Sequence, residues 1–227
     1  MKQALLLSSS GYKDTGYLTH AKDMVREFLG SCKNIVFIPF AGVRRTYDEY
    51  EKKVQDALGM ENIVSIHRFS DKKKAITDAD AIVVGGGNTF ELLHQLYEHD
   101  LVELIRKRVD DGALYVGWSA GSNVAGASMK TTNDMPIVMP KSFDGFKIFP
   151  YQINPHFISG KIPGHNGESR EERLEEYLIL NKQDIIYALP EGCALKINGN
   201  HVDIIGGDIL KITYPFEVQT LKGSFDI

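Results

Sequence analysis

A serine enclosed by two glycines is the most chemically suggestive feature of the sequence. Residues Gly117–Gly121 read G-W-S-A-G and match the G-x-S-x-G pattern of a nucleophile elbow. In such an elbow a sharp strand-to-helix turn exposes the serine hydroxyl, and side chains two positions before and after it would collide. The apolar run Ala113–Val116 before the motif and the small residues after it fit that setting. The pattern predicts a nucleophilic Ser119, and its alternative is a structural turn with an idle serine.

A nucleophilic serine needs a general base, and the sequence offers seven histidines. His156 stands out because it follows the rigid pair Asn154-Pro155 and precedes Phe157, which indicates an ordered stretch. The other histidines lie in predicted helices, at strand ends, in a hairpin or in a polar loop. We assign His156 as the base because the elbow requires one, and the alternative is a loop histidine bonded only to backbone.

The acid that would orient the histidine has two candidates. Asp134 lies between the serine and the histidine in the chain, whereas Glu191 follows a predicted strand, from which an acid could reach the edge of the sheet. Either residue could instead be an ordinary turn acid. Sequence spacing does not choose between Asp134 and Glu191.

The elements that must position these residues alternate in the first half of the chain. Helical spacing of apolar residues occurs in Tyr17–Leu29 and in Asn88–Val109. Apolar runs rich in β-branched residues, typical of strands, are Ala4–Leu7, Ile35–Phe40, Ile63–Ile66, Ala81–Val84 and Ala113–Val116. This alternation predicts an α/β fold with a mostly parallel central sheet and helices on both faces.

The second half of the chain has a different pattern. Residues Ser128–Gly167 have little periodicity and are predicted to be mostly loop, and a helix is predicted near Glu168–Leu180. Strand-like runs separated by turn residues follow at Ile185–Leu189, Ala194–Ile197, Val202–Ile205, Ile209–Thr213 and Val218–Leu221. These hairpin signals predict an antiparallel extension at one edge of the sheet. Because no linker divides the chain, we expect residues 1–227 to form one α/β domain.

The composition is that of an ordinary globular protein, with 43% hydrophobic and 25% charged residues. The net charge of −4 gives no reason to expect nucleic acid as a partner. No stretch approaches the roughly 18 consecutive apolar residues of a membrane helix. The N-terminal apolar run is too short for a secretory signal, and Cys32 and Cys193 lack metal-type spacing. We therefore expect a cytoplasmic, reduced protein without a metal or an organic cofactor.

Six motifs, in order, resemble those of the peptidase E family, the α-aspartyl dipeptidases. They are Phe37–Val43 (F-I-P-F-A-G-V), Val84–Phe90 (V-G-G-G-N-T-F), Gly117–Gly121 (G-W-S-A-G), Thr131–Val138 (T-T-N-D-M-P-I-V), Gln152–Phe157 (Q-I-N-P-H-F) and Leu189–Gly192 (L-P-E-G). The resemblance implies a fold like that of class I glutamine amidotransferases, related to the flavodoxin-like arrangement. It also implies a serine exopeptidase that removes an N-terminal α-linked aspartate from dipeptides through a covalent acyl-enzyme.

The same resemblance implies roles for individual residues. Ser119 would be the nucleophile and His156 its base, while the family has been described with both acids, so Asp134 and Glu191 stay open. The backbone N–H groups of Gly87 and Ala120 would form the oxyanion hole. The glycine loop could alternatively cradle a phosphate, but it lacks the Lys-Ser/Thr ending of a phosphate-binding loop.

Substrate recognition would depend on a fixed cation, because arginine suits a carboxylate. Arg170 occupies the family's G-E-S-R-E position and is the candidate, although acidic neighbours could simply pair with it along a helix. Asn88 and Thr89 complete the predicted substrate-binding set. The expected partner is a small peptide with an N-terminal aspartate, and a homodimer is compatible with the C-terminal strands. Alternatives are a cyanophycinase-like hydrolase of aspartyl-arginine polymer and a non-catalytic binding protein on the same fold.

Overall fold

A run of parallel strands forms the centre of the protein, whose computed structural model describes residues 1–161, 163–164 and 166–227. In spatial order they are β1 (Gln3–Leu7), β5 (Leu114–Trp118), β4 (Ala81–Val84), β2 (Ile35–Ile38) and β3 (Ile63–Ser65). Each is a short run of buried, largely β-branched or aliphatic residues, as a sheet covered on both faces requires. The predicted parallel sheet is therefore confirmed.

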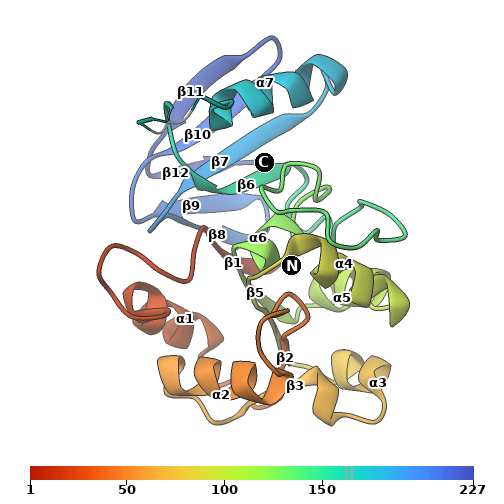
Figure 1. Cartoon of the computed structure of the whole chain (residues 1–227). Coiled ribbons are helices and arrows are strands. Elements are labelled where there is room, and N and C mark those ends of the chain that lie inside the picture. The colour runs from red at the N-terminus through yellow and green to blue at the C-terminus, as the bar shows by residue number, and fades with distance from the viewer. Residues whose placement is uncertain (162, 165) are drawn as a thin grey trace.

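Helices cover both faces of this sheet, because successive side chains of a strand point to opposite sides. Leu5 and Leu7 of β1 pack in one apolar cluster with residues of α1 (Lys22–Leu29) and α2 (Tyr47–Leu58). Ala4 and Leu6 pack in the opposite cluster with residues of α3 (Lys72–Thr77), α4 (Thr89–Glu98) and α5 (Val102–Asp110). In Figure 1, α1 and α2 lie on the left and lower side of the strands, and α3–α5 lie on the right. Short 3₁₀ turns, η1 (Thr19–Ala21) and η2 (Ile66–Arg68), precede α1 and follow β3.

The C-terminal strands divide between two sheets. The antiparallel strands β8 (Ala194–Asn198), β9 (His201–Ile205) and β12 (Ser224–Asp226) extend the central sheet beyond β1, which gives eight strands in the described residues. The other strands, β6 (Gln152–Phe157), β7 (Ile185–Pro190), β10 (Ile209–Thr213) and β11 (Glu217–Leu221), form a separate four-stranded sheet. The predicted antiparallel extension is thus right for β8 and β9, and wrong for β7, β10 and β11.

The second sheet packs between the first sheet and α7 (Arg170–Leu180). Its inner face contributes Tyr187 and Leu189 to the same buried cluster as Ala4 and Leu6 of β1. The ring centroids of Phe149 and Tyr187 lie 4.9 Å apart. Its outer face is covered by Leu174 and Leu178 of α7. In Figure 1 this sheet and α7 occupy the upper part of the molecule, and the glycine-rich turn after β9 carries the chain back to it.

Three predicted segments differ from the structure. The helix expected over Asn88–Val109 is two helices, because Asp100 takes a left-handed φ of 52° and ends the first. The loop expected over Ser128–Gly167 contains β6, and the predictions did not name α2 or α3. None of the helices in the described residues is long and apolar enough to cross a bilayer.

Candidate active site

The sharp turn at Ser119 has the geometry that the glycine spacing predicts. Ser119 joins β5 to α6 (Ala120–Asn123) with φ 54° and ψ −115°, a conformation that L-residues rarely adopt. A Cβ on Gly117 would lie 2.6 Å from the carbonyl carbon of Gly121, and a Cβ on Gly121 would lie 2.2 Å from the carbonyl oxygen of Val84. Any larger residue at either position would therefore force the turn open.

A serine, a histidine and a glutamate are hydrogen-bonded in series at this turn. The Oγ of Ser119 lies 2.8 Å from Nε2 of His156, and Nδ1 of His156 lies 2.9 Å from Oε1 of Glu191. An imidazole protonated at Nδ1 donates to the Glu191 carboxylate and leaves Nε2 free to accept the serine proton. The arrangement can therefore activate a hydroxyl nucleophile. His156 comes from β6, and Glu191 directly follows β7, so the second sheet supplies both.

The His156 backbone is held in an unusual conformation by a contact that the sequence analysis missed. Its φ is 54°, and the pairing of β6 with β7 is irregular between Asn154 and Phe157. The His156 N–H donates to Oγ of Ser8 at 2.9 Å, and the Ser8 hydroxyl donates to the Leu189 carbonyl at 2.8 Å. Ser8 directly follows β1, and its side chain is buried. It therefore ties the central sheet to β6 and β7, the strands that supply His156 and Glu191 to the hydrogen-bonded series Ser119–His156–Glu191, called the relay below. Its position after an apolar strand was the only signal in the sequence.

Asp134 lies away from His156 in the hydrogen-bond network. Its Oδ2 accepts from the backbone N–H of Thr89 at 2.7 Å and from the Thr89 hydroxyl at 2.5 Å, with Thr132 Oγ1 at 3.3 Å. Of the two candidate acids, Glu191 is the one that contacts the imidazole. Asn88 caps α4 through its Oδ1 and donates from Nδ2 to the Met135 carbonyl, which fixes the segment that bears Asp134.

The glycine loop Gly85–Gly87 lies directly beside the serine turn. It follows β4, where Val84 pairs with Gly117 of β5, and a Cβ on Gly86 would lie 2.9 Å from Cβ of Ser119. Gly87 has φ 137°, and a Cβ there would lie 2.1 Å from the Ala41 carbonyl oxygen, so only glycine fits. Among the described residues, no hydrogen bond is made by the backbone N–H of Gly87 or of Ala120. These two amides, one of them at a helix N-terminus, are available to an oxyanion.

Arg170 opens α7 with a guanidinium that its acidic neighbours leave unpaired. Glu171 accepts from Ser159 and Gly160, whereas Glu168 pairs with Arg173 at 3.7 Å. Nη1 of Arg170 is buried and has no hydrogen-bond partner among the described residues. Burial lowers the pKa of Arg170, and the nearby Asp134 carboxylate counteracts that shift. The alternative that Arg170 pairs along its own helix is therefore not what the structure shows.

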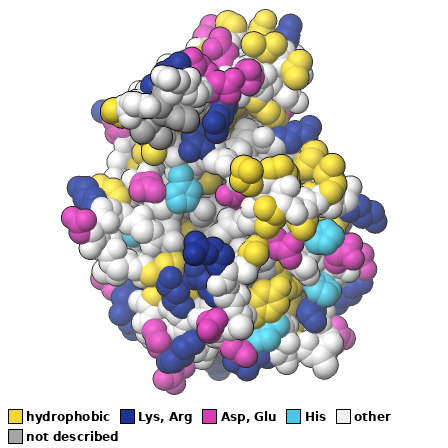
Figure 2. Space-filling view, viewed as in Figure 1, with side chains coloured by type: hydrophobic (Ala, Val, Ile, Leu, Met, Phe, Trp, Pro, Cys, Tyr) yellow, Lys and Arg dark blue, Asp and Glu magenta, His cyan; other side chains and the backbone are white. Residues whose placement is uncertain are grey.

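The surface seen in Figure 2 is mixed in charge and carries an apolar area on one side. Figure 2 shows acidic, basic and histidine side chains close together where the upper and lower parts of the molecule meet. Hydrophobic side chains gather to the right of this region, over the loop that follows α6 in Figure 1. The exposed apolar residues of that loop are Met135, Ile137, Met139 and Phe143.

Comparison with known proteins identifies the family. Residues 4–205 match the family model described as Peptidase family S51. The chain is 58% identical over 211 residues to Peptidase E of Haemophilus influenzae, covering 91% of this chain and 96% of that protein. It is 55% identical over 225 residues to Peptidase E of Actinobacillus pleuropneumoniae serotype 7, covering 97% and 96%.

A solved structure shares the fold at low sequence identity. The crystal structure of a peptidase from an acI-B1 Actinobacterium superposes with a TM-score of 0.70 at 19% identity, covering 100% of this chain and 97% of that one. At this identity the likeness concerns the fold alone. The family model and the two curated relatives, which span nearly the whole chain, show that this protein belongs to peptidase family S51 and is a hydrolase of the serine peptidase type.

Proposed function

We propose that this protein is a dipeptidase that hydrolyses dipeptides with an N-terminal α-linked aspartate, with Ser119 as nucleophile. The observation that carries the proposal is the hydrogen-bonded series Ser119–His156–Glu191, together with a half-buried Arg170 whose Nη1 has no hydrogen-bond partner among the described residues. The series can activate a serine hydroxyl for hydrolysis, and the guanidinium of Arg170 would favour a substrate with an acidic side chain.

The first half of the reaction would form an acyl-enzyme. The Ser119 hydroxyl attacks the carbonyl carbon of the aspartyl residue while Nε2 of His156 accepts its proton, and Glu191 stabilises the resulting imidazolium. The negative charge that develops on the carbonyl oxygen is met by the N–H groups of Gly87 and Ala120. His156 then gives its proton to the departing amino group of the second residue.

The second half would release aspartate. Water takes the place of the departed amine, His156 removes a proton from it, and the hydroxide attacks the acyl carbon. The tetrahedral intermediate collapses, the proton returns to Ser119, and free aspartate leaves. Each step uses the same base and the same oxyanion donors, so one constellation serves both halves.

Recognition of the substrate would be shared between Arg170 and Asp134. The planar guanidinium of Arg170 suits the aspartyl side-chain carboxylate, and its burial strengthens that interaction. The Asp134 carboxylate lies near Arg170 and is a suitable partner for the free ammonium group of the substrate. Thr89 and Asn88 would then contribute indirectly, because they hold Asp134 and its segment in place.

The test is a comparison of dipeptides on the wild-type protein and its Ser119→Ala variant. The substrates are Asp-Leu, Glu-Leu, Asn-Leu and β-linked Asp-Leu, with aspartyl-arginine polymer as a separate sample, and released amino acids are quantified. We expect free aspartate from Asp-Leu alone and none from the variant. Release from the polymer but not from Asp-Leu would replace the proposal with a polymer hydrolase. Equal release by the variant would remove Ser119 from the mechanism.

A further inference from the structure

The peptide plane between Gly86 and Gly87 can flip as a unit through rotation about ψ of Gly86 and φ of Gly87. The carbonyl of Gly86 and the N–H of Gly87 belong to the same planar trans unit, so they point in opposite directions. Neither flanking residue carries a Cβ to oppose rotation, and Gly87 already has φ 137°. A flip of this unit would turn the Gly87 N–H away from the developing oxyanion.

In the part of the chain that the structure describes, backbone–backbone hydrogen bonds hold the two ends of the glycine loop and not its centre. The Gly85 N–H donates to the Ile38 carbonyl at 3.1 Å, and the Asn88 N–H donates to the Ala41 carbonyl at 2.9 Å. In the described residues, the Gly87 N–H has no such partner. The orientation of the central peptide therefore depends on what its carbonyl contacts.

That contact is a buried tyrosine from a distant part of the chain. The Tyr50 hydroxyl donates to the Gly86 carbonyl at 2.8 Å, and the residue is 2% exposed. A Cβ on Gly42 would lie 2.6 Å from the ring, and one on Gly85 would lie 2.5 Å from the hydroxyl oxygen, so glycines on either side make room for it. Tyr17 donates to the same oxygen at 3.4 Å, and burial raises the pKa of Tyr50, which keeps its hydroxyl protonated as a donor.

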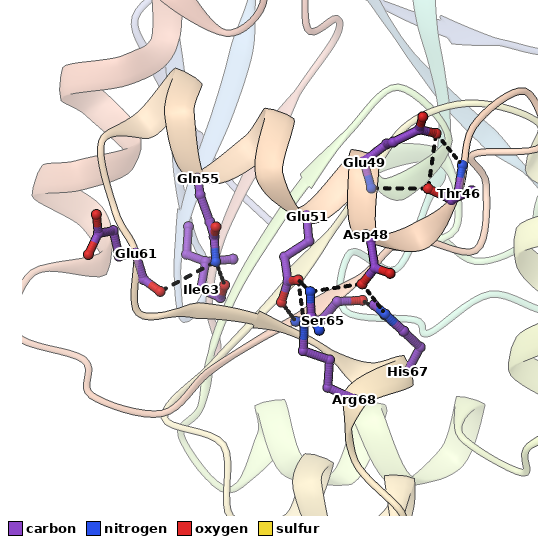
Figure 3. Close-up of polar contacts among 10 residues, drawn as sticks. All are labelled: Thr46, Asp48, Glu49, Glu51, Gln55, Glu61, Ile63, Ser65, His67 and Arg68. Carbon is purple, nitrogen blue, oxygen red and sulfur yellow. Dashed lines mark hydrogen bonds and ion pairs between the residues drawn. The ribbon is translucent and has the colours of Figure 1, made fainter.

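The helix that carries Tyr50 is itself fixed to the neighbouring strand (Figure 3). Glu51, the next residue of α2, accepts from the backbone N–H of Ser65 at 2.7 Å and from Nε of Arg68 at 2.5 Å. Asp48, two residues before Tyr50, contacts Nε2 of His67 through its Oδ1 at 2.9 Å. These bonds, from residues on both sides of position 50, tie α2 to the end of β3 and to η2.

We propose that Tyr50 is a positioning residue that locks the Gly86–Gly87 peptide in the orientation in which the Gly87 N–H faces the oxyanion. This inference rests on the proposed serine-peptidase mechanism and adds a residue to it. Tyr50 does not touch the substrate. It acts through the carbonyl on the opposite side of the peptide that the reaction uses.

The test is Tyr50→Phe, which keeps the ring and removes only the hydroxyl. With Asp-Leu as substrate we expect kcat to fall about 10- to 100-fold, less than the 10²–10³-fold loss that removal of a whole oxyanion donor causes, with KM within about twofold of wild type. An aspartyl aldehyde, which adds to Ser119 and places its oxygen in the oxyanion hole, should bind more weakly by a similar factor. Binding of the product aspartate should not change.

A control and a rescue separate positioning from a general loss of stability. Tyr97→Phe also removes a hydroxyl that donates to a backbone carbonyl, that of Asp144 at 3.1 Å, and should leave kcat unchanged. Incorporation of p-aminophenylalanine at position 50, whose amino group can donate to the Gly86 carbonyl, should restore part of the lost kcat. A folded Tyr50→Phe variant with wild-type kcat, or one in which only KM rises, would overturn the proposal.

A second measurement does not depend on turnover. In wild-type protein labelled with ¹⁵N-glycine, we expect one sharp Gly87 amide resonance without millisecond exchange, and a second or broadened resonance in Tyr50→Phe. Millisecond conformational exchange of the Gly87 amide in the wild type would contradict the proposal that Tyr50 fixes this peptide, even if Tyr50→Phe does not fold. Absence of Asp-Leu hydrolysis by wild-type protein, with the Gly87 resonance behaving as expected, would instead refute the proposed function and leave the lock without a catalytic role.

Discussion

At the scale of single residues, the proposed chemistry depends on two side chains whose backbones are strained. Ser119 and His156 both have φ of 54°, and such conformations persist only where surrounding bonds impose them. Ser119 is held because its N–H donates to the Leu7 carbonyl at 3.1 Å, and His156 because its N–H donates to Ser8. In these conformations Oγ of Ser119 and Nε2 of His156 lie 2.8 Å apart, although the two residues come from different sheets.

The choice between the two acids gives a sharp prediction. Glu191→Gln retains shape but removes the charge that stabilises the imidazolium, so kcat should fall by about 10²–10⁴-fold. Asp134→Asn should act mainly on substrate binding and raise KM more than it lowers kcat. Steady-state kinetics on Asp-Leu measure both. A large kcat loss confined to Asp134→Asn would reverse the assignment.

Arg170 supplies a second prediction at this scale. Replacement by Met removes a charged partner of the aspartyl carboxylate, and kcat/KM for Asp-Leu should fall about 10- to 100-fold, because a hydrogen bond to a charged group contributes roughly 1.5–3 kcal/mol. The matched control is Arg173→Met on the same helix, whose guanidinium is exposed and pairs with Glu168. Equal losses in the two variants would show that α7, rather than Arg170, matters.

The residue types in the sequence were sufficient to identify the candidate residues. They were not sufficient to show which of these residues contact one another in the fold. The glycines around Ser119 and the Asn-Pro before His156 are local signals, readable without a fold. Asp134 and Glu191 are both plausible by type, and the difference between them is which one lies 2.9 Å from an imidazole on another strand. Tyr50 has no local signature, and Ser8 has only its position after an apolar strand, because their roles depend on contacts with residues 36 and 148 positions away.

At the scale of elements, α2 shows how a peripheral helix supports the glycine loop. Its N-terminus carries a capping box in which Thr46 accepts from the Glu49 N–H and Glu49 accepts from the Thr46 N–H. Its apolar face is narrow, consisting of Tyr50, Val54 and Leu58 among charged residues, which is why the sequence analysis did not name it. The same face brings Tyr50 to the glycine loop.

The capping box predicts a modest effect on stability. Thr46→Ala should lower the free energy of unfolding by about 1 kcal/mol, which corresponds to a fall in Tm of about 2–4 °C for a protein of this size. Differential scanning calorimetry measures this. Thr46→Ser, which keeps the capping oxygen, is the control and should melt close to wild type.

The same capping box predicts a dependence on pH. Hydrogen bonds from the backbone and side chain of Thr46 lower the pKa of Glu49. A carboxyl group whose pKa is lower in the folded state stabilises the protein above its unfolded pKa, near 4.3, and loses that contribution as the pH falls through its folded pKa. The stability difference between wild type and Glu49→Gln should therefore be constant from pH 7 to 5 and shrink below pH 4. Urea denaturation across this range would contradict the prediction if the difference grew in acid.

At the scale of the whole molecule, the relay is divided between two sheets. The central sheet supplies Ser119, and the second sheet supplies His156 and Glu191, so their alignment depends on how the sheets pack. The alternation of strands and helices was sufficient to predict the parallel sheet. It was insufficient to place β6 and β10, because β6 contains a proline and an irregular pairing, and nothing local shows that the chain changes sheet after β9.

A residue between the sheets tests this dependence. Phe149 is fully buried and contacts the rings of Tyr151 and Tyr187 at centroid distances of 5.4 Å and 4.9 Å. Phe149→Ala should cost about 3–5 kcal/mol of stability and also lower kcat, because the cavity lets the second sheet shift relative to Ser119. Phe149→Leu should lose less of both. An unchanged kcat in a destabilised Phe149→Ala variant would show that the relay does not depend on this packing.

The strained turn at Ser119 also has an evolutionary consequence. A non-glycine residue at φ 54° and ψ −115° costs on the order of 1–3 kcal/mol, whereas glycine adopts such a conformation freely and loses only up to about 1 kcal/mol in chain entropy. Ser119→Gly should therefore yield an inactive protein at least as stable as the wild type. In a descendant that is no longer selected for turnover, glycine could therefore replace Ser119 without loss of stability. We expect the nucleophile to be the first of the active-site residues to be replaced in such a lineage.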